Sequence, residues 1–180
     1  MKLSAQAVGE AHALRCELAG EVLHSSGSLH LRVTGWSMLP TVWPGDTLVI
    51  EQVSSDQLCE GDIVMFSSGR RFVAHRVVAF GHDASGSMVQ TQGDAVSRPD
   101  CPLAASDLLG KVSFILRNER WIEPSRRLRV SERAVAAVLR RSSFAARFVV
   151  AIRGMLQKSY SPSPVPTSRV QASRVQTAPI

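Results

Sequence analysis

The first 25 residues carry apolar side chains at helical intervals. Residues 5–25 are rich in alanine, and Leu14, Leu18 and Val22 recur every four residues, with Leu23 beside them. This is the spacing of one face of a helix. A Ser-Ser-Gly sequence follows and is typical of a helix end. We therefore predict a helix over residues 5–25.

From residue 28 onward the pattern changes to that of short strands. Leu29, Leu31 and Val33 alternate with polar residues, which is the period of a half-buried strand. Further strands are predicted, with Gly- and Pro-containing turns between them, at 47–53, 63–66, 71–80, 88–91 and 110–116. Many short strands separated by turns predict a mainly β body.

After Pro124 the composition changes again. Residues 131–158 predict one long amphipathic helix, because Arg133, Arg140 and Arg147 recur every seven residues opposite a face of Val, Ala, Ile and Leu. Residues 159–180 are rich in Pro and Ser and contain no acid, which predicts disorder. The predicted units are an N-terminal helix at 1–27, a β-domain at 28–123, a basic amphipathic helix at 124–158 and a disordered tail at 159–180.

Charge is distributed unevenly along the chain. Residues 1–123 contain 10 Lys/Arg and 14 Asp/Glu, whereas residues 124–180 contain 11 Lys/Arg and a single acid, Glu132. A basic tail of this kind usually binds phosphate, on lipid or on nucleic acid. We predict that residues 131–158 bind an anionic membrane surface; packing of the same helix on the β body is the alternative.

Cysteine spacing and the N-terminal residues limit the other classes of function. The three cysteines, Cys16, Cys59 and Cys101, are far apart and odd in number, so we expect thiols rather than disulfides or a metal site. Charged residues within the first 20 positions argue against both a secretory signal and a membrane span. We expect no metal or cofactor, and a cytoplasmic or peripheral-membrane protein.

Three short motifs contain the side chains that a serine peptidase needs. Ser37 lies in a glycine-led turn, and its hydroxyl becomes a nucleophile only when a base removes its proton. His75 lies in a β-rich run and offers an imidazole, the side chain best suited to that transfer near neutral pH. Asp94 and Asp100 frame a loop, and one carboxylate could orient the imidazole. Each motif alone also fits an ordinary turn or strand.

In their order and spacing these motifs resemble the signal peptidase type I family, and specifically its archaeal and endoplasmic-reticulum branch. The matching segments are Ser37-Met38 with Pro40, Pro44-Gly45-Asp46, residues 61–66, His75-Arg76-Val77-Val78, Gly93-Asp94 with Asp100, and Gly110-Lys111-Val112. The resemblance implies a signal-peptidase or repressor-peptidase-like β body, with the N-terminal helix and the long C-terminal amphipathic helix added to it.

The resemblance also implies a role for each site residue. Ser37 matches the nucleophile, and His75 matches the general base, a position that holds lysine in the ordinary bacterial branch. Asp100 matches the third member of the triad and Asp94 a nearby supporting acid. The implied reaction is cleavage of an extended peptide or preprotein after a small residue, through an acyl-enzyme, with the substrate paired to a strand edge. Trp36, Met38 and Pro40 are candidate residues of the substrate cleft.

The chain departs from the family pattern at two places. Gly35 stands where the family commonly has a serine that helps to stabilise the oxyanion, a form closer to the related self-cleaving repressors. Loss of one such donor costs about 2.7–4 kcal/mol in barrier height, so Thr34 and backbone N–H groups are the expected replacements. Residues 5–25 predict a charged helix where the family normally has a membrane anchor.

Two other functions fit the same residues. The first is a soluble self-cleaving regulator whose basic helix binds nucleic acid. The 27 residues before the first strand are too few for a helix-turn-helix, so nucleic acid is the less favoured partner. The second is a non-enzymatic module that docks peptides without cleaving them, against which the intact Ser-His-Asp set argues.

Overall fold

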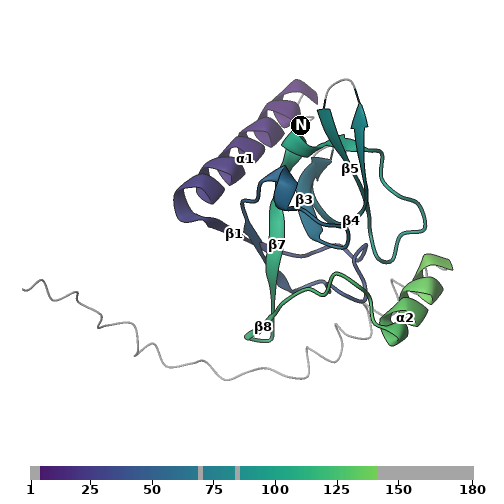
Figure 1. Cartoon of the computed structure of the whole chain (residues 1–180). Coiled ribbons are helices and arrows are strands. Elements are labelled where there is room, and N and C mark those ends of the chain that lie inside the picture. Colours follow the sequence, from purple (N-terminus) through teal and green to yellow (C-terminus); the bar gives the residue numbers. More distant parts are fainter. Residues whose placement is uncertain (1–4, 69–70, 84–85, 142–180) are drawn as a thin grey trace, which may run out of the picture.

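The computed structural model describes residues 5–68, 71–83 and 86–141, which form an antiparallel sheet with two helices (Figure 1). The mainly β fold class predicted from the sequence is confirmed. In chain order the elements are α1 (Ala5–Ser26), β1 (Ser28–Arg32), β2 (Thr47–Glu51), a 3-10 turn (Ser55–Gln57), β3 (Ile63–Ser68), β4 (Arg71–Asp83), β5 (Gly86–Gln92), β6 (Leu103–Ala104), a second 3-10 turn (Ala105–Asp107), β7 (Leu108–Arg117), β8 (Arg120–Ile122) and α2 (Val130–Arg141).

Most of the predicted elements are present, and the differences lie at their ends. β4 extends three residues beyond the predicted run. Two strands were not predicted: β6 has two residues, and β8 has three and follows a tight turn in which Asn118 and Glu119 both have positive φ. α2 coincides with the first part of the helix predicted at 131–158. The rest of that helix and the predicted disordered tail lie outside the described residues, and the domain boundaries remain predictions.

β7 lies at the centre of the sheet because it pairs with both β2 and β3. The strand order is β1-β2-β7-β3-β4-β5-β6, with β8 added beside β7, and every pairing is antiparallel. Within the described pairings, β1 contacts only β2. β4 pairs with β5 only from Arg76 onward, so in the described strand pairings residues 71–75 pair with β3. Each of these two segments is thus paired with a described strand along one edge.

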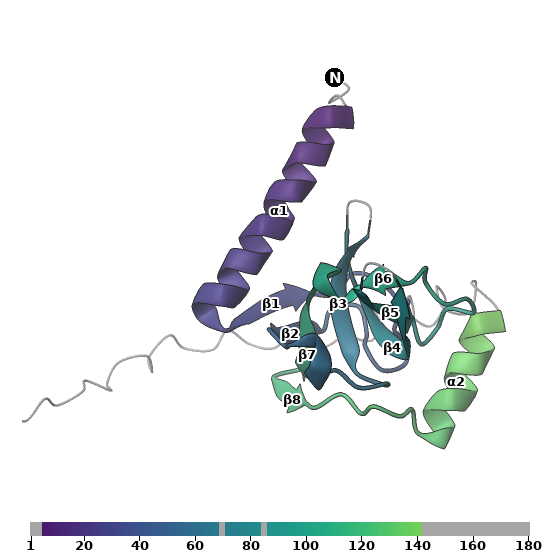
Figure 2. The ribbon, with the colours of Figure 1, turned by 45° about the horizontal axis from the view of Figure 1, so that its top comes forward.

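The two helices lie on opposite sides of the sheet, as two views show (Figures 1 and 2). Ala19 and Leu23 are the residues by which α1 packs on the body, and Leu23 joins the main core cluster. Leu14, Leu18 and Val22 are exposed instead. The four-residue repeat of Leu14, Leu18 and Val22 thus does not mark the face that packs. That face contains Ala19 and Leu23, on the neighbouring side of the same helix.

A strap of residues 123–129 connects β8 to α2 and is fastened to the body by charge. Arg126 donates to the buried Asp62 at 2.7 Å, and Lys111 lies 3.2 Å from the same carboxylate. Burial raises the pKa of Asp62, but hydrogen bonds from Arg126, the Cys59 N–H and Lys111 outweigh it and hold that pKa below its usual value. The strap therefore follows a defined path toward α2.

Neither described helix is both long enough and apolar enough to cross a bilayer. The cysteines are thiols, as predicted, and those of Cys59 and Cys101 are exposed.

Candidate active site

Ser37 lies in the loop between β1 and β2, on a turn that its apolar neighbours anchor. Met38 is 4% exposed and belongs to the main core cluster, whereas Leu39 is fully buried in a second cluster with Ala95 and Leu139. The Val42 N–H donates to the Met38 carbonyl at 2.9 Å and closes the turn, which includes a cis Leu39–Pro40 peptide. Two buried side chains on different clusters therefore hold the half-buried serine in place.

His75 stands between Ser37 and Asp100. It is buried on β4, with its Nε2 atom 2.9 Å from Ser37 Oγ and its Nδ1 atom 2.6 Å from Asp100 Oδ2. The imidazole and the ring of Phe66 on β3 meet in a T-shaped arrangement, with ring centroids 6.1 Å apart. The three side chains named as a triad from the sequence thus lie in hydrogen-bonding contact, in the order nucleophile, base and acid.

Thr91 of β5, which the sequence analysis missed, holds Asp100. Its side chain is fully buried, and its hydroxyl donates to Asp100 Oδ2 at 2.7 Å. The Asp100 N–H donates to the Thr91 carbonyl at 2.8 Å, so the two residues are joined twice. The two contacts fix the position of the carboxylate that accepts from His75 Nδ1. A threonine in a strand is too common for its position alone to have indicated this contact.

Gly93, which the sequence placed in a matching segment without a role, allows the chain after β5 to lie against the triad. A Cβ atom at this position would lie 2.7 Å from the Ser37 carbonyl oxygen and 3.0 Å from His75 Nε2. Two residues on, the Ala95 N–H donates to the same Ser37 carbonyl at 2.8 Å. The loop that contains Asp94 and Asp100 is therefore docked directly on the backbone of the nucleophile.

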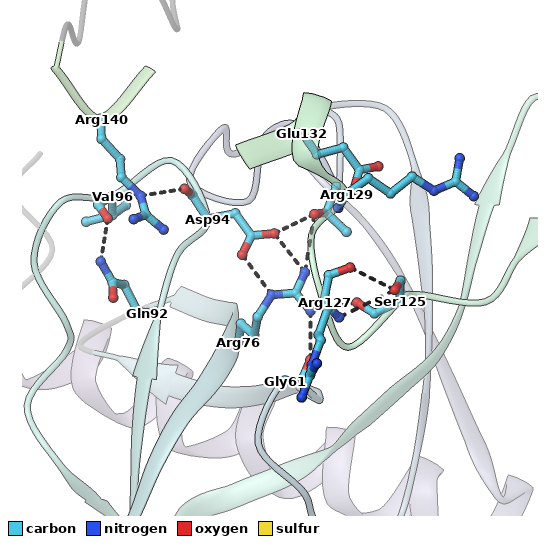
Figure 3. Close-up of polar contacts among 11 residues, drawn as sticks. Gly61, Arg76, Gln92, Asp94, Val96, Ser125, Arg127, Arg129, Glu132 and Arg140 are labelled. Atoms are coloured by element: carbon cyan, nitrogen blue, oxygen red, sulfur yellow. Dashed lines mark hydrogen bonds and ion pairs between the residues drawn. The ribbon is translucent and has the colours of Figure 1, made fainter. Parts of the chain in front are cut away.

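Asp94 lies apart from the triad, in a buried ion pair with Arg76 (Figure 3). Arg76 Nε and Nη2 each donate to its carboxylate at 2.8 Å, and the Thr41 hydroxyl donates to it as well. No described hydrogen bond joins Asp94 to His75. Because neighbouring strand residues point to opposite faces, His75 is directed toward the triad and Arg76 away from it.

The Arg76 guanidinium also connects segments that are distant in the sequence (Figure 3). Its Nη1 atom donates to the Gly61 carbonyl at 2.7 Å and to the Ser125 carbonyl of the strap at 2.8 Å. Arg76 thus joins the strand of His75, the loop of Asp94 and the strap.

α2 contacts both the loop of Asp94 and the turn of Ser37. Arg140 Nε donates to the Asp94 carbonyl at 2.9 Å (Figure 3), and Leu139 packs against Leu39 and Ala95. The described part of the predicted basic helix therefore packs on the body, which is the alternative that the sequence left open. Glu132, in the first turn of α2, accepts from the Arg129 N–H at 2.8 Å and caps the helix.

A cleft of about 520 Å³ opens beside Ser37. It is lined by residues from β1, the nucleophile turn and the start of β4, and the lining includes Gly35, Trp36 and Met38. Pro40, also predicted for the cleft, is not among the lining residues. A larger hollow of about 770 Å³ lies between β7 and the strap and contains no member of the triad. The smaller cleft is the one lined by Ser37, so we take it as the candidate substrate site.

No group of three or more His, Cys, Asp or Glu side chains suited to a metal ion occurs within the described part of the chain.

We expect Asp94→Asn to lower mainly the stability of the protein and Asp100→Asn to lower mainly its activity. Removing one partner of a buried ion pair costs about 3–5 kcal/mol, and both Arg76 and Asp94 are buried. Asp94→Asn should therefore lower the free energy of unfolding by about 3 kcal/mol or more. Asp100→Asn, whose side chain is 30% exposed, should change it by under about 1 kcal/mol while reducing peptide cleavage.

Urea denaturation of the two variants and the parent measures this difference. A larger loss of stability in Asp100→Asn than in Asp94→Asn would contradict the separate roles.

Comparison with known proteins agrees with this geometry. Residues 4–89 match the family model described as Peptidase S24-like. The matched segment includes Ser37 and His75 and ends before Asp94 and Asp100. No curated protein gives a significant match. Residues 4–89 of the chain are therefore similar to an S24-like serine peptidase domain.

Proposed function

We propose that the chain is a serine endopeptidase of the signal-peptidase type, which cleaves an extended peptide through an acyl-enzyme. The supporting observation is the continuous contact from Ser37 Oγ through the His75 imidazole to Asp100 Oδ2. In this proposal Ser37 is the nucleophile, His75 is the general base and Asp100 orients the imidazole. Thr91 and Asp94 act through other residues: Thr91 positions Asp100, and Asp94 holds the surrounding segments through Arg76.

The proposed reaction begins with neutral His75, whose Nδ1–H donates to Asp100 and whose Nε2 accepts from Ser37. Ser37 Oγ attacks the peptide carbonyl carbon as its proton passes to Nε2. When the tetrahedral intermediate collapses, the C–N bond breaks and the imidazolium gives that proton to the departing amine. Water then attacks the acyl-enzyme by the same route, which releases the carboxylic acid and regenerates the serine.

The oxyanion needs donors beside Ser37, and Gly35 supplies no side chain. We propose that the Ser37 N–H acts with the hydroxyl of Thr34, which lines the same cleft. The position of Gly35 itself is open, because no heavy atom lies within 4 Å of where its Cβ would be.

The strands beside the cleft suggest how a peptide binds. β1 and residues 71–74 of β4 both line the cleft, and in the described strand pairings each is paired along one edge. An extended peptide can add to the edge of a strand by main-chain hydrogen bonds. We propose this mode for the substrate, with cleavage after a small residue as the resemblance to signal peptidases implies.

Self-cleavage is a second candidate, favoured by the match to the S24-like family and by the Gly35-x-Ser37-Met38 sequence. In that case the substrate is a segment of the chain itself. The fraction of protein that an intramolecular cut converts per unit time does not depend on protein concentration. The fraction of Ser37→Ala protein that the parent enzyme cleaves per unit time does. Incubation at several concentrations separates the two functions.

Peptide cleavage should disappear in Ser37→Ala. We expect a loss of at least about 10³-fold in kcat, because the variant has no nucleophile for the acyl-enzyme. The assay is hydrolysis of a peptide with alanine one and three positions before the cut. Ser97→Ala, an exposed serine of the Asp94–Asp100 loop, is the matched control and should retain full activity. Full activity in Ser37→Ala would end the assignment of the nucleophile.

Gly35→Ser should increase kcat. A hydroxyl at this position adds an oxyanion donor, a type of contact worth about 10²–10³-fold in kcat when its geometry is right, and the open space around Gly35 accommodates it. Steady-state kinetics should show a higher kcat with little change in KM. Gly35→Ala adds the same Cβ without the hydroxyl, so it should leave kcat unchanged. Equal effects of the two substitutions would exclude the donor explanation.

Binding of the basic C-terminal helix to an anionic membrane surface also remains a proposal. Within α2, Ala136 and Leu139 are buried against the body and Arg140 is bound to the Asp94 loop. The proposal therefore rests on residues 142–158, which lie outside the described residues. A truncation after Pro124 would also remove the contacts of the strap, so substitutions are the cleaner test.

Co-sedimentation with vesicles tests that proposal. The protein should pellet with vesicles that contain anionic lipid at low salt, and less so at high salt. Because each cation near such a surface contributes about 1 kcal/mol, the triple variant Arg147→Gln, Arg153→Gln, Lys158→Gln should bind about 100-fold more weakly. Arg120→Gln on β8 is the control. Protein that stays in the supernatant at low salt would refute the membrane role.

A further inference from the structure

The cleft beside Ser37 combines an apolar floor with positive charge. Its floor is apolar, with Leu31, Val33, Met38 and Phe72 among the lining residues. The same lining contains two arginines, Arg32 and Arg71, and no acidic residue.

Both arginines are directed away from the core. On β1, Leu31 and its apolar neighbours pack against the main core cluster, so Arg32 between them faces the other way. On β4, Phe72 and Ala74 pack on that cluster, which places Arg71 on the same face as His75. Both are exposed. Both arginines nonetheless line the cleft, one on β1 and one on β4.

Arg32 and Arg71 also lack counter-charges within the described part of the chain. Arg76, Arg117 and Arg126 each form an ion pair with a buried aspartate. No ion pair of the described residues includes either of the two cleft arginines. Two exposed guanidinium groups without a carboxylate partner, beside a groove that reaches the nucleophile, are complementary to an anionic ligand.

We propose that the substrate peptide carries an acidic side chain about four residues from the bond that is cut. Arg71 precedes His75 by four residues on one strand, which corresponds to about 13 Å at the rise of an extended chain. A peptide added beside β4 covers that distance with four residues of its own. Its carboxylate is held by Arg71 and Arg32, and its apolar side chains cover the floor of the cleft. This inference rests on the proposed function, and it adds the chemical class of the substrate.

A set of peptides with one glutamate, moved through the five positions on each side of the cut, tests the proposal. Each is compared with the peptide that has glutamine at the same place. We expect glutamate about four residues from the cut to raise kcat/KM by about three- to tenfold, mainly through KM, at low salt. Arg71→Gln or Arg32→Gln should reduce that preference and the double variant should remove it. Arg120→Gln, an exposed arginine outside the cleft, should leave it unchanged.

Charge reversal gives a second measurement. Arg71→Glu should prefer lysine over glutamate at the same position. Cleavage with no preference for glutamate at any position would overturn the inference and leave the peptidase intact. A preference that survives in the Arg32→Gln, Arg71→Gln double variant would also overturn it, because the charge would then be recognised elsewhere.

Binding to Ser37→Ala separates this inference from the proposed function. Fluorescence anisotropy of labelled peptides on that variant measures recognition without turnover. Tighter binding of the glutamate peptide, dependent on Arg71, would support the acidic ligand even if the parent enzyme cleaves nothing, in which case the peptidase assignment fails. Equal binding of the glutamate and glutamine peptides would overturn the inference. Absence of both binding and cleavage would overturn both proposals.

Discussion

The buried ion pair of Arg76 and Asp94 is the contact on which the arrangement of the site depends. A guanidinium and a carboxylate are expensive to bury, and they are retained in a protein interior only when almost all their hydrogen-bonding capacity is used. Here Arg76 reaches Asp94, the Gly61 carbonyl and the Ser125 carbonyl together. The geometry that satisfies this one side chain also sets the relative positions of β4, the Asp94 loop and the strap.

Strand geometry connects that structural contact to the contacts among Ser37, His75 and Asp100. His75 and Arg76 are consecutive, so one side chain is directed to the triad while the next is held on the opposite face of the strand. Gly93 and Asp94 repeat this relation: Gly93 lies against Ser37 and His75, and Asp94 lies against Arg76. Contacts on the far side of the backbone therefore help to position the triad, and Thr91 holds Asp100 from the near side.

The sequence predicted the parts of this protein that have local signals. Alternation identified β1, and the order of the Ser37, His75 and Asp100 motifs identified the three side chains that meet in the structure. It did not predict Thr91 or the role of Gly93, because their importance comes from contacts with residues distant in the chain. The sequence grouped Asp94 with the triad because Asp94 and Asp100 are close in the chain. Closeness in the chain does not show that Asp94 is directed to Arg76 and Asp100 to His75. The short β6 and β8 have too few residues to form a pattern.

The docking of α2 on the Asp94 loop has a thermodynamic consequence. Arg140 and Leu139 contact the Asp94 loop and the turn of Ser37, and that turn also lines the cleft proposed for the substrate. Two events that stabilise one conformation promote each other to the same extent, whichever comes first. If the proposed substrate stabilises the same conformation of the turn, a ligand that draws α2 away from the body weakens its binding, and the bound substrate opposes that ligand by an equal free energy. The C-terminal helix and the cleft are in this sense two sites of one equilibrium.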